Sequence, residues 1–272
     1  MPQISLGTHE LDATKLGLVR KVGVTQIVAE TAEPWMEGLK AILVPSDADL
    51  KAAPAVSNEW VRARPLDTLV VYQNTSGSTN IPKTFGMDLR RIRKITDIYA
   101  GDAKERRSLR AGSIEFDAHR LNRICMLIAG NTCVFLRQVN AGALVATCER
   151  AGVSIIHMGA YRLASLLQSS SGNGRLPATT AIQSGGARVP GHLRMKVKAR
   201  LTDNLWVQYA TSEAGLISMA SPDQHDRFPE GVGFPAPEVT LEIVNAEGEI
   251  LPPGEIGHIR LRKRTLPGGY VA

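Results

Sequence analysis

The chain has 272 residues and a formal net charge of +6, and 43% of its residues are hydrophobic while 5% are aromatic. It is too long for one very small domain and can bury a substantial core. No apolar run approaches the roughly 20 residues of a membrane helix, and the N-terminus lacks the features of a signal peptide. Cys125, Cys133 and Cys148 lack metal-type spacing, which favours reduced thiols in a cytoplasmic protein.

Helices and strands are predicted in alternation along most of the chain. Residues 18–28 and 41–44 indicate a helix and a strand in alternation, and the apolar run 69–72 predicts a strand. Residues 120–135 predict a helix that leads into a strand, and 141–156 repeat that order. Such alternation predicts an α/β fold, a layered sheet core with helices on both faces.

An amphipathic helix is predicted over residues 90–99, with its isoleucines and Tyr99 on one face. Its basic residues, Arg90 to Lys94, are interpreted as the solvated face of that helix. Further basic residues gather at 104–107 and 194–200. A basic surface leaves nucleic-acid binding open as a weaker alternative, but few aromatic side chains are present to stack on bases. Attraction for a polyanionic small molecule or an acidic protein partner accounts for the charge as well.

The C-terminal segment has a different pattern. From Gly231 onward, apolar residues alternate with polar ones and are broken by Gly, Asn and Pro, which is typical of strands joined by tight turns. We therefore expect an α/β core over 1–230 and a small β-rich subdomain over 231–272.

A loop rich in small hydroxyl residues follows the strand predicted at 69–72. It reads Thr75, Ser76, Gly77, Ser78, Thr79, Asn80, Ile81, Pro82 and Lys83. Short side chains let backbone N–H groups approach phosphate oxygens, the hydroxyls add donors, and the ammonium adds positive charge. A Walker A loop does not fit, because Pro82 occupies the position of its second glycine. A polar loop between a strand and a helix is the plain alternative.

This loop resembles the phosphate loop of the adenylate-forming superfamily, which includes acyl-CoA synthetases, luciferases and peptide-synthetase adenylation domains. The superfamily pattern is [ST]-S-G-[ST]-T-G-x-P-K, and the chain departs from it only at Asn80. Asparagine tolerates the left-handed backbone better than most residues that carry a Cβ. The resemblance implies that Thr75 to Lys83 hold the β- and γ-phosphates of ATP.

Two later segments resemble the same superfamily in order and spacing. Gly185-Gly186-Ala187 match its S-G-G-A segment, whose backbone lies beside the adenine and the acyl substrate. Tyr209-Ala210-Thr211-Ser212-Glu213 match its Y-G-x-T-E segment. The resemblance implies that Tyr209 stacks on adenine, that Ser212 bonds near the α-phosphate and that Glu213 ligates Mg²⁺. The plain alternatives are a Gly-Gly turn, a half-buried strand tyrosine and a glutamate at the start of a helix.

Gly254-Glu255-Ile256-Gly257 match a G-E-x-G segment of the superfamily's small distorted β-barrel. The substrate pocket is expected to include His157, Gly185, Ala214 and Gly215, although a structural role for His157 is equally open. Lys83, Ser212 and Glu213 would be the catalytic residues.

By resemblance, the chain activates a small carboxylic acid with ATP and passes the acyl group to CoA or to the phosphopantetheine arm of a carrier protein. The superfamily also has a ribose-binding aspartate, in a [YF]-x-[ST]-G-D segment, and a mobile C-terminal lid domain with a lysine. The aspartate is expected after Tyr270, and the printed chain ends at Ala272. Asp117 stands where a histidine is expected. A shortened large domain without the lid is therefore expected, and a catalytically incomplete remnant or interaction module remains the alternative.

Overall fold

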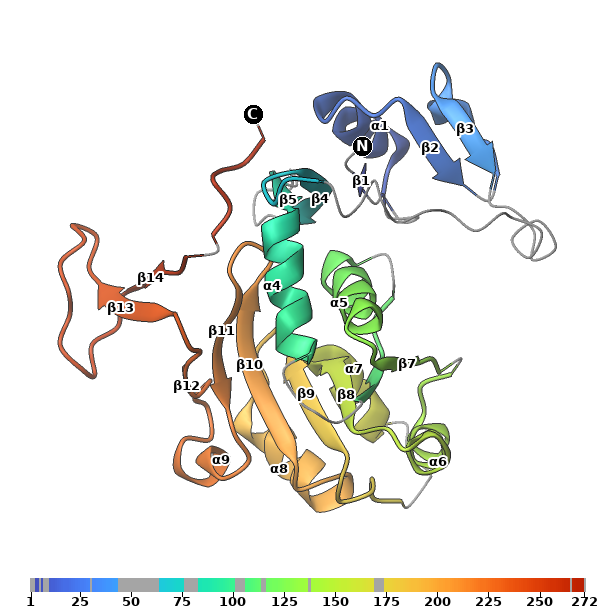
Figure 1. The fold of residues 1–272 in the computed structure, drawn as a ribbon. Helices are drawn as coiled ribbons and strands as arrows, with labels where there is room; N and C mark the ends of the chain where they lie inside the picture. Colours follow the sequence, from blue (N-terminus) through green and yellow to red (C-terminus); the bar gives the residue numbers. More distant parts are fainter. Residues whose placement is uncertain are drawn as a thin grey trace. The chain divides into compact units, whose positions relative to one another are not determined.

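The computed structural model describes residues 3–4, 6, 10–29, 31–43, 64–75, 83–100, 106–113, 116–136, 138–168, 174–264 and 266–271. It divides into two compact units (Figure 1). The N-terminal unit comprises Met1–Ile92 together with Gly269–Ala272, and the sheet unit comprises Arg93–Gly268. Among the described residues, no helix is long and apolar enough to cross a membrane.

The N-terminal unit contains two small sheets. In the first, β1 (Gln3–Ile4) runs parallel to β4 (Leu69–Thr75), which pairs antiparallel with β5 (Lys83–Asp88). In the second, β2 (Gln26–Ala29) pairs in parallel with β3 (Lys40–Leu43). Helix α1 (Asp12–Lys21) buries Leu18 and Val19, and η1 (Pro34–Met36) buries Met36. Residues 18–28 contain the end of α1 and most of β2, and the strand indicated at 41–44 is present as β3, which begins at Lys40.

A seven-stranded sheet forms the centre of the sheet unit, with the strand order β12-β11-β10-β9-β8-β6-β7. Strands β10, β9, β8, β6 and β7 are mutually parallel, whereas β11 and β12 pair antiparallel at one edge. The bounds are β6 Arg107–Arg110, β7 Thr132–Val134, β8 Ile155–Gly159, β9 Ala181–Gly185, β10 Leu205–Thr211, β11 Gly215–Ala220 and β12 Phe234–Pro235. Parallel neighbours place their carboxyl ends along one edge of the layer.

Helices lie on both faces of this sheet, and the expected α/β fold is confirmed. In Figure 1, α5 lies in front of the sheet and α7 and α8 lie behind it. The helix bounds are α4 Leu89–Ala100, α5 Asp117–Ile128, α6 Ala141–Ala151, α7 Ala160–Gln168, α8 Gly191–Arg200 and α9 Gln224–Arg227. Apolar residues of α6, α7 and α8 share one core with β8, β9 and β10, centred on Leu144, Leu163, Val197, Ile156 and Ile182. Burial of these side chains from water is the main contribution to the stability of the layer.

Helix α4 forms where it was predicted, and its apolar face is only partly covered. No residue of α4 is fully buried, and Ile98 keeps 65% of its surface exposed. Its basic residues are not all solvated either, since Arg91 lies 5.4 Å from the ring centre of Phe85 and Lys94 pairs with Glu238. The periodic pattern therefore predicted the helix correctly, and the interpretation of its basic residues as a solvated face holds for Arg90 and Arg93 but not for the half-buried Arg91.

Two interpretations of local structure are corrected. The loop after Thr75 leads into strand β5 and not directly into a helix, which also differs from the strand-loop-helix order of a Walker A motif. Glu213 lies in a hairpin turn between β10 and β11, so no helix begins there. Near the C-terminus, β13 (Thr240–Val244) and β14 (His258–Arg262) form a two-stranded antiparallel sheet, as the turn pattern indicated. The small barrel and the boundary at residue 231 stay predictions.

Candidate functional site

The ends of the predicted phosphate loop are held together in the N-terminal unit. Thr75 closes β4 and is the cross-strand partner of Lys83, the first residue of β5. Next to this pair, the Thr84 hydroxyl donates to the Asn74 side-chain oxygen at 2.9 Å. Residues 76–82, which include the predicted Ser76, Gly77, Ser78 and Thr79, lie outside the described residues. The pairing of β4 with β5 thus fixes the positions of the two ends of the loop.

Lys83 is exposed, and its ammonium lies 5.3 Å from the ring centre of Tyr270. A cation over an aromatic face is attracted by the ring quadrupole. The neighbouring Val271 N–H donates to the Thr84 carbonyl at 2.7 Å, which ties the C-terminal segment to β5. Tyr270 therefore belongs to the surroundings of Lys83, a neighbour that sequence reasoning did not identify.

In the sheet unit, the other predicted residues gather at the carboxyl ends of β8, β9 and β10. Gly159, the last residue of β8, pairs with Gly185, the last residue of β9. The position of a Cβ on Gly185 would lie 2.8 Å from the Gln208 carbonyl oxygen, so β10 packs directly against β9 there. Tyr209 follows Gln208 and lies one step closer to the strand end. Carboxyl ends of parallel strands in open α/β sheets are the usual place for ligands.

Positions 185 and 186 at this edge require glycine for different physical reasons. At Gly185 a side chain is excluded by contact with Gln208. At Gly186 the backbone is left-handed, with φ of +81°, and no atom lies within 4 Å of the position that a Cβ would take. Glycine adopts this conformation without steric cost. Gly186 and the exposed Ala187 therefore present open backbone, which a flat ligand can approach closely.

The segment from Tyr209 to Gly215 is a hairpin turn preceded by a bulge. The register of β10 against β11 shifts between Tyr209 and Ala210, which re-aims the residues that follow. The Thr211 hydroxyl accepts from the Ala214 N–H at 3.0 Å, and Gly215 takes a left-handed φ of +66°. Ser212 is exposed and Glu213 is half-buried at the tip of this turn. The local sequence therefore presents a hydroxyl and a carboxylate on a turn closed by its own hydrogen bond.

A lysine outside the predicted motifs also supports the turn. The Lys263 ammonium donates to the carbonyl oxygens of Ala214 and Leu216, both at 2.8 Å. Hydrogen bonds from a charged donor are stronger than those between neutral groups. Lys263 follows β14, so a residue distant in sequence braces the turn that carries Glu213.

The donor set at Glu213 fits magnesium better than a transition metal. The described residues contain no group of three or more His, Cys, Asp or Glu side chains that could enclose a metal ion. Magnesium is usually bound through one or two carboxylates together with waters and substrate phosphates. One half-buried carboxylate beside the exposed Ser212 hydroxyl is consistent with that requirement.

His157 is buried in β8, with 8% of its surface exposed, and its Nε2 lies 3.3 Å from Nη2 of Arg110. Burial and the neighbouring Arg110 charge hold the pKa of His157 well below its ordinary value. The imidazole is therefore neutral near pH 7. Sequence reasoning identified His157 but not its basic neighbours, which come from β6 and α5 and show no common spacing along the chain.

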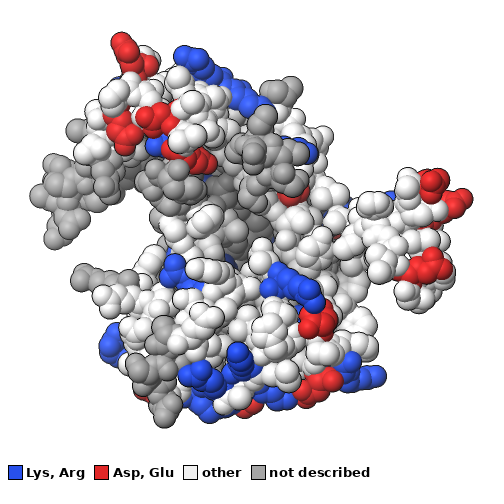
Figure 2. Space-filling model, turned by 180° about the vertical axis from the view of Figure 1, so that it is seen from behind, with Lys and Arg blue, Asp and Glu red and all other residues white. Residues whose placement is uncertain are grey.

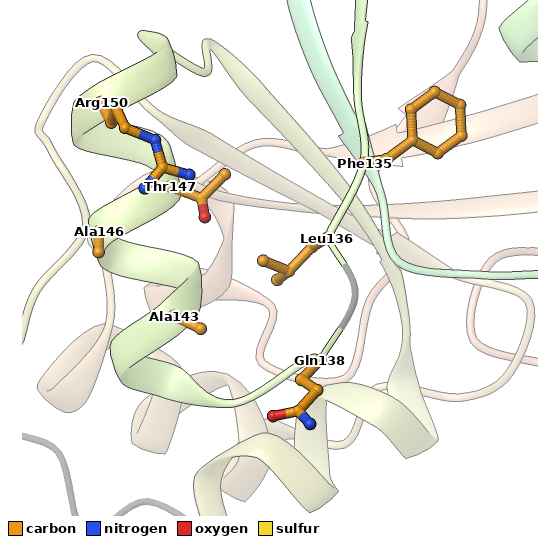
Figure 3. A pocket seen from close by; sticks show the side chains of 7 residues that line it. All are labelled: Phe135, Leu136, Gln138, Ala143, Ala146, Thr147 and Arg150. Atoms are coloured by element: carbon orange, nitrogen blue, oxygen red, sulfur yellow. The ribbon is translucent and has the colours of Figure 1, made fainter.

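A hollow of about 440 Å³ lies elsewhere in the sheet unit, between α6 and the segment that follows β7 (Figure 3). Leu136 points toward α6 across this hollow, whereas the Phe135 ring points away from it. Its remaining lining residues are Gln138, Ala143, Ala146, Thr147 and Arg150. None of the predicted site residues that the structure describes lines it.

Basic side chains on the face drawn in Figure 2 are interspersed with acidic ones. In the predicted cluster at 194–200, Lys198 pairs with Asp226 at 3.0 Å. Arg194 is 4% exposed and donates to the carbonyls of Val189 and Gly231, both at 2.8 Å. Residues 104 and 105 of the cluster at 104–107 lie outside the described residues. Several of these basic groups therefore have partners within the fold, which weakens the case for nucleic-acid binding.

Comparison with known proteins gives one family match across nearly the whole chain. The family model described as AMP-binding enzyme matches residues 8–271. An uncharacterized acyl–CoA ligase, YhfT of Bacillus subtilis, is 27% identical over 202 residues, which are 72% of this chain and 41% of that protein. Cyclosporin synthetase of Tolypocladium inflatum is 25% identical over 274 residues, which are 96% of this chain and 2% of that protein.

Solved structures share the fold at low sequence identity. O-succinylbenzoate coenzyme A synthetase from Bacillus subtilis, in complex with ATP and magnesium ion, has a TM-score of 0.81 at 19% identity, covering 99% of this chain and 57% of that one. The amide bond synthetase McbA from Marinactinospora thermotolerans has a TM-score of 0.77 at 21% identity, covering 98% and 57%. The chain thus spans about half the length of these two proteins.

Proposed function

We propose that this chain, which belongs to the family of AMP-binding enzymes, activates a carboxylic acid with ATP to form an acyl-adenylate and pyrophosphate. A thiol then takes the acyl group and releases AMP. The observation that carries the proposal is a set of residues at the carboxyl ends of the adjacent strands β9 and β10. It consists of open glycine backbone, a tyrosine and a turn that bears a carboxylate.

The adenine is proposed to lie against this edge of the sheet. The backbone of Gly185, Gly186 and Ala187 would pass along one side of the base, and Tyr209 would supply an aromatic face. Gly186 supports this role because space is open where a side chain would stand. Ala210, Thr211 and Ser212 follow Tyr209 in the chain and are proposed to contact the nucleotide as well, Ser212 being exposed.

The polyphosphate is proposed to be bound by Thr75 to Lys83. Backbone N–H groups and hydroxyls would contact the β- and γ-phosphate oxygens, with the Lys83 ammonium as the counter-charge. Lys83 is exposed and rests near the Tyr270 ring. A cation–π contact at an exposed site is worth only about 0.5–1 kcal/mol, so it does not prevent the ammonium from turning to phosphate.

Magnesium is proposed to bind at Glu213, with the remaining ligands coming from ATP and water. When bound, the ion neutralises phosphate charge and makes the α-phosphorus easier to attack. Thr211 and Lys263 hold the turn on which the carboxylate stands. The protein's own contribution is therefore a fixed position for Glu213.

The reaction needs little covalent chemistry from the protein. A carboxylate oxygen of the acid attacks the α-phosphorus, the bond to the bridging oxygen breaks, and the electron pair leaves with pyrophosphate. Positioning of the two reactants and stabilisation of developing negative charge account for most of the acceleration in such steps. His157, Gly185, Ala214 and Gly215 are proposed to border the acid, on strands that end at the same edge.

The acyl acceptor is proposed to be CoA. Support comes from the names of the relatives, which include an acyl–CoA ligase and a coenzyme A synthetase. A carrier protein with a phosphopantetheine arm would present the same thiol and is the alternative acceptor.

Acid-dependent exchange of radiolabelled pyrophosphate into ATP tests the proposal directly. The full chain is incubated with MgATP and a panel of aliphatic, aromatic and amino acids. Exchange that depends on one class of acid, and that falls in Lys83→Ala, is expected. MgATP binding without exchange for any acid would instead support a nucleotide-binding module without catalysis, which is the alternative. Arg107→Met serves as the control variant, because Arg107 is exposed at the opposite end of β6.

A further inference from the structure

A cluster of basic side chains lies at the carboxyl ends of β6 and β8. Arg110, the last residue of β6, is the cross-strand partner of His157, and its Nη2 also donates to the Tyr99 hydroxyl at 2.8 Å. Arg123 of α5 donates through Nη2 to the carbonyls of Arg110 at 2.7 Å and of Gly112 at 2.9 Å. His119, also on α5, packs against Gly112. Four basic groups from three elements therefore meet in one place.

Among the side chains that the structure describes, none is an acidic partner of this basic cluster (Arg110, His119, Arg123 and His157). Neither arginine takes part in an ion pair there. Arg110 Nε, Arg123 Nη1 and His119 Nδ1 are buried without a hydrogen-bond partner. Buried polar groups in folded proteins are almost always satisfied by protein, water or ligand, so three unsatisfied donors or acceptors in one cluster give a bound polar group several hydrogen bonds to make.

The positive charge in this cluster comes from the two arginines. Burial and the neighbouring arginines lower the pKa of His119 to about 4, and burial with Arg110 lowers the pKa of His157 well below its ordinary value. Both imidazoles are therefore neutral near pH 7. Burial also lowers the pKa of Arg110 and of Arg123, but guanidinium groups stay protonated in proteins. Arg123 lies 5.2 Å from the ring centre of Phe135, but neither guanidinium has an anionic partner among the described side chains, and an anion would lower the cost of burying the two charges.

The location of the cluster points to the acid and not to ATP. His157 stands opposite Gln183 of β9, two residues before the Gly185 that the proposed function places beside the acid. Arg110 and His119 are half-buried, so they can be reached from solvent, whereas Arg123 is 6% exposed. Planar guanidinium groups match the geometry of a carboxylate through paired N–H bonds.

We infer that the acid activated by this chain carries a second anionic group, a carboxylate, which binds at Arg110 with Arg123 and His119 beside it. This inference rests on the proposed function. It assigns the substrate class as dicarboxylic acids, in which one carboxylate is activated and the other is held by the basic cluster. Arg110 is then a specificity-determining residue, because a monocarboxylic acid would leave the two guanidinium charges without an anionic partner.

Matched acyl-adenylate analogues test this inference. Each pair is an acyl-sulfamoyl adenosine of the same length, one ending in a carboxylate and the other in a methyl group, prepared with short, medium and aromatic spacers. Isothermal titration calorimetry with the full chain measures the dissociation constant of each. At the matching length, we expect the carboxylate-ended analogue to bind at least about tenfold tighter, as charge-assisted hydrogen bonds provide.

Substitutions test whether Arg110 causes the preference for the carboxylate-ended analogue. Arg110→Met is expected to abolish it, Arg110→Lys to retain part of it, and Arg107→Met, an exposed change on the same strand, to leave it intact. Equal affinity within every wild-type pair would overturn the inference and leave the proposed function standing. No binding by any analogue would overturn the proposed function itself. The wild-type comparison needs no variant, so it remains decisive if Arg110→Met fails to fold.

Discussion

Substitution of Gly186 by alanine distinguishes a backbone requirement for glycine from a requirement for open space beside a bound ligand. The left-handed φ of Gly186 is +81°, and no atom would touch the added Cβ. The cost is therefore backbone strain of roughly 1–2 kcal/mol. The reduced entropy of the unfolded chain offsets about 0.4–1 kcal/mol of that. A net loss of about 1 kcal/mol in unfolding free energy is expected, measured from urea transitions.

Gly130 provides the matched control, with φ of +79° and no atom within 4 Å of a Cβ position, at the end of α5 and away from the proposed site. Gly130→Ala is expected to lose the same stability as Gly186→Ala. The two variants should differ in AMP binding, where only Gly186→Ala raises the dissociation constant, by roughly tenfold or more, because its Cβ occupies space proposed for the base. Equal AMP affinity in the two variants would refute the placement of adenine at Gly186.

Three further predictions concern the sheet unit. Lys263→Met removes the donor shared by the Ala214 and Leu216 carbonyls and should lower the unfolding free energy by about 1–3 kcal/mol, whereas an unchanged urea midpoint would show that this brace is dispensable. The pKa of His119 is about 4 in the folded chain and 6.5 in the unfolded chain, so the unfolding free energy should fall as pH drops from 6.5 toward 4. His119→Gln should flatten that decline, and identical pH profiles of the wild-type chain and the variant would contradict this. Burial raises the pKa of Cys148 to about 11, so a disulfide reagent should modify it only after denaturation, and rapid labelling of the native chain would count against its burial.

Much of the fold could be predicted because its signals are local. The helix over 141–151 and the strand that begins at Ile155 follow from a periodic apolar pattern and from Gly152, which ends the helix in a left-handed conformation. The burial of α4 could not be predicted in the same way. Its isoleucine spacing specifies a helical face, but whether another element covers that face depends on tertiary packing, and Ile98 remains exposed.

The same distinction between local and long-range signals applies to the candidate site. Gly185, Tyr209 and Glu213 were identifiable because they lie in short contiguous motifs. Arg110 and Lys263 were not, because each acts through a partner distant in sequence that only the strand pairing brings near. The turn at Glu213 was also missed, since Thr211, Ala214 and Gly215 specify a hairpin through one side-chain bond and one left-handed residue, signals that resemble the start of a helix.

Titration of the full chain with MgATP, followed by calorimetry, tests the central claim most directly. We expect saturable binding by the wild-type chain, a marked loss of affinity in Lys83→Ala, and retained affinity in Lys196→Ala, a change at an exposed lysine of α8. Absence of MgATP binding by the folded wild-type chain, or equal affinity in Lys83→Ala, would contradict it.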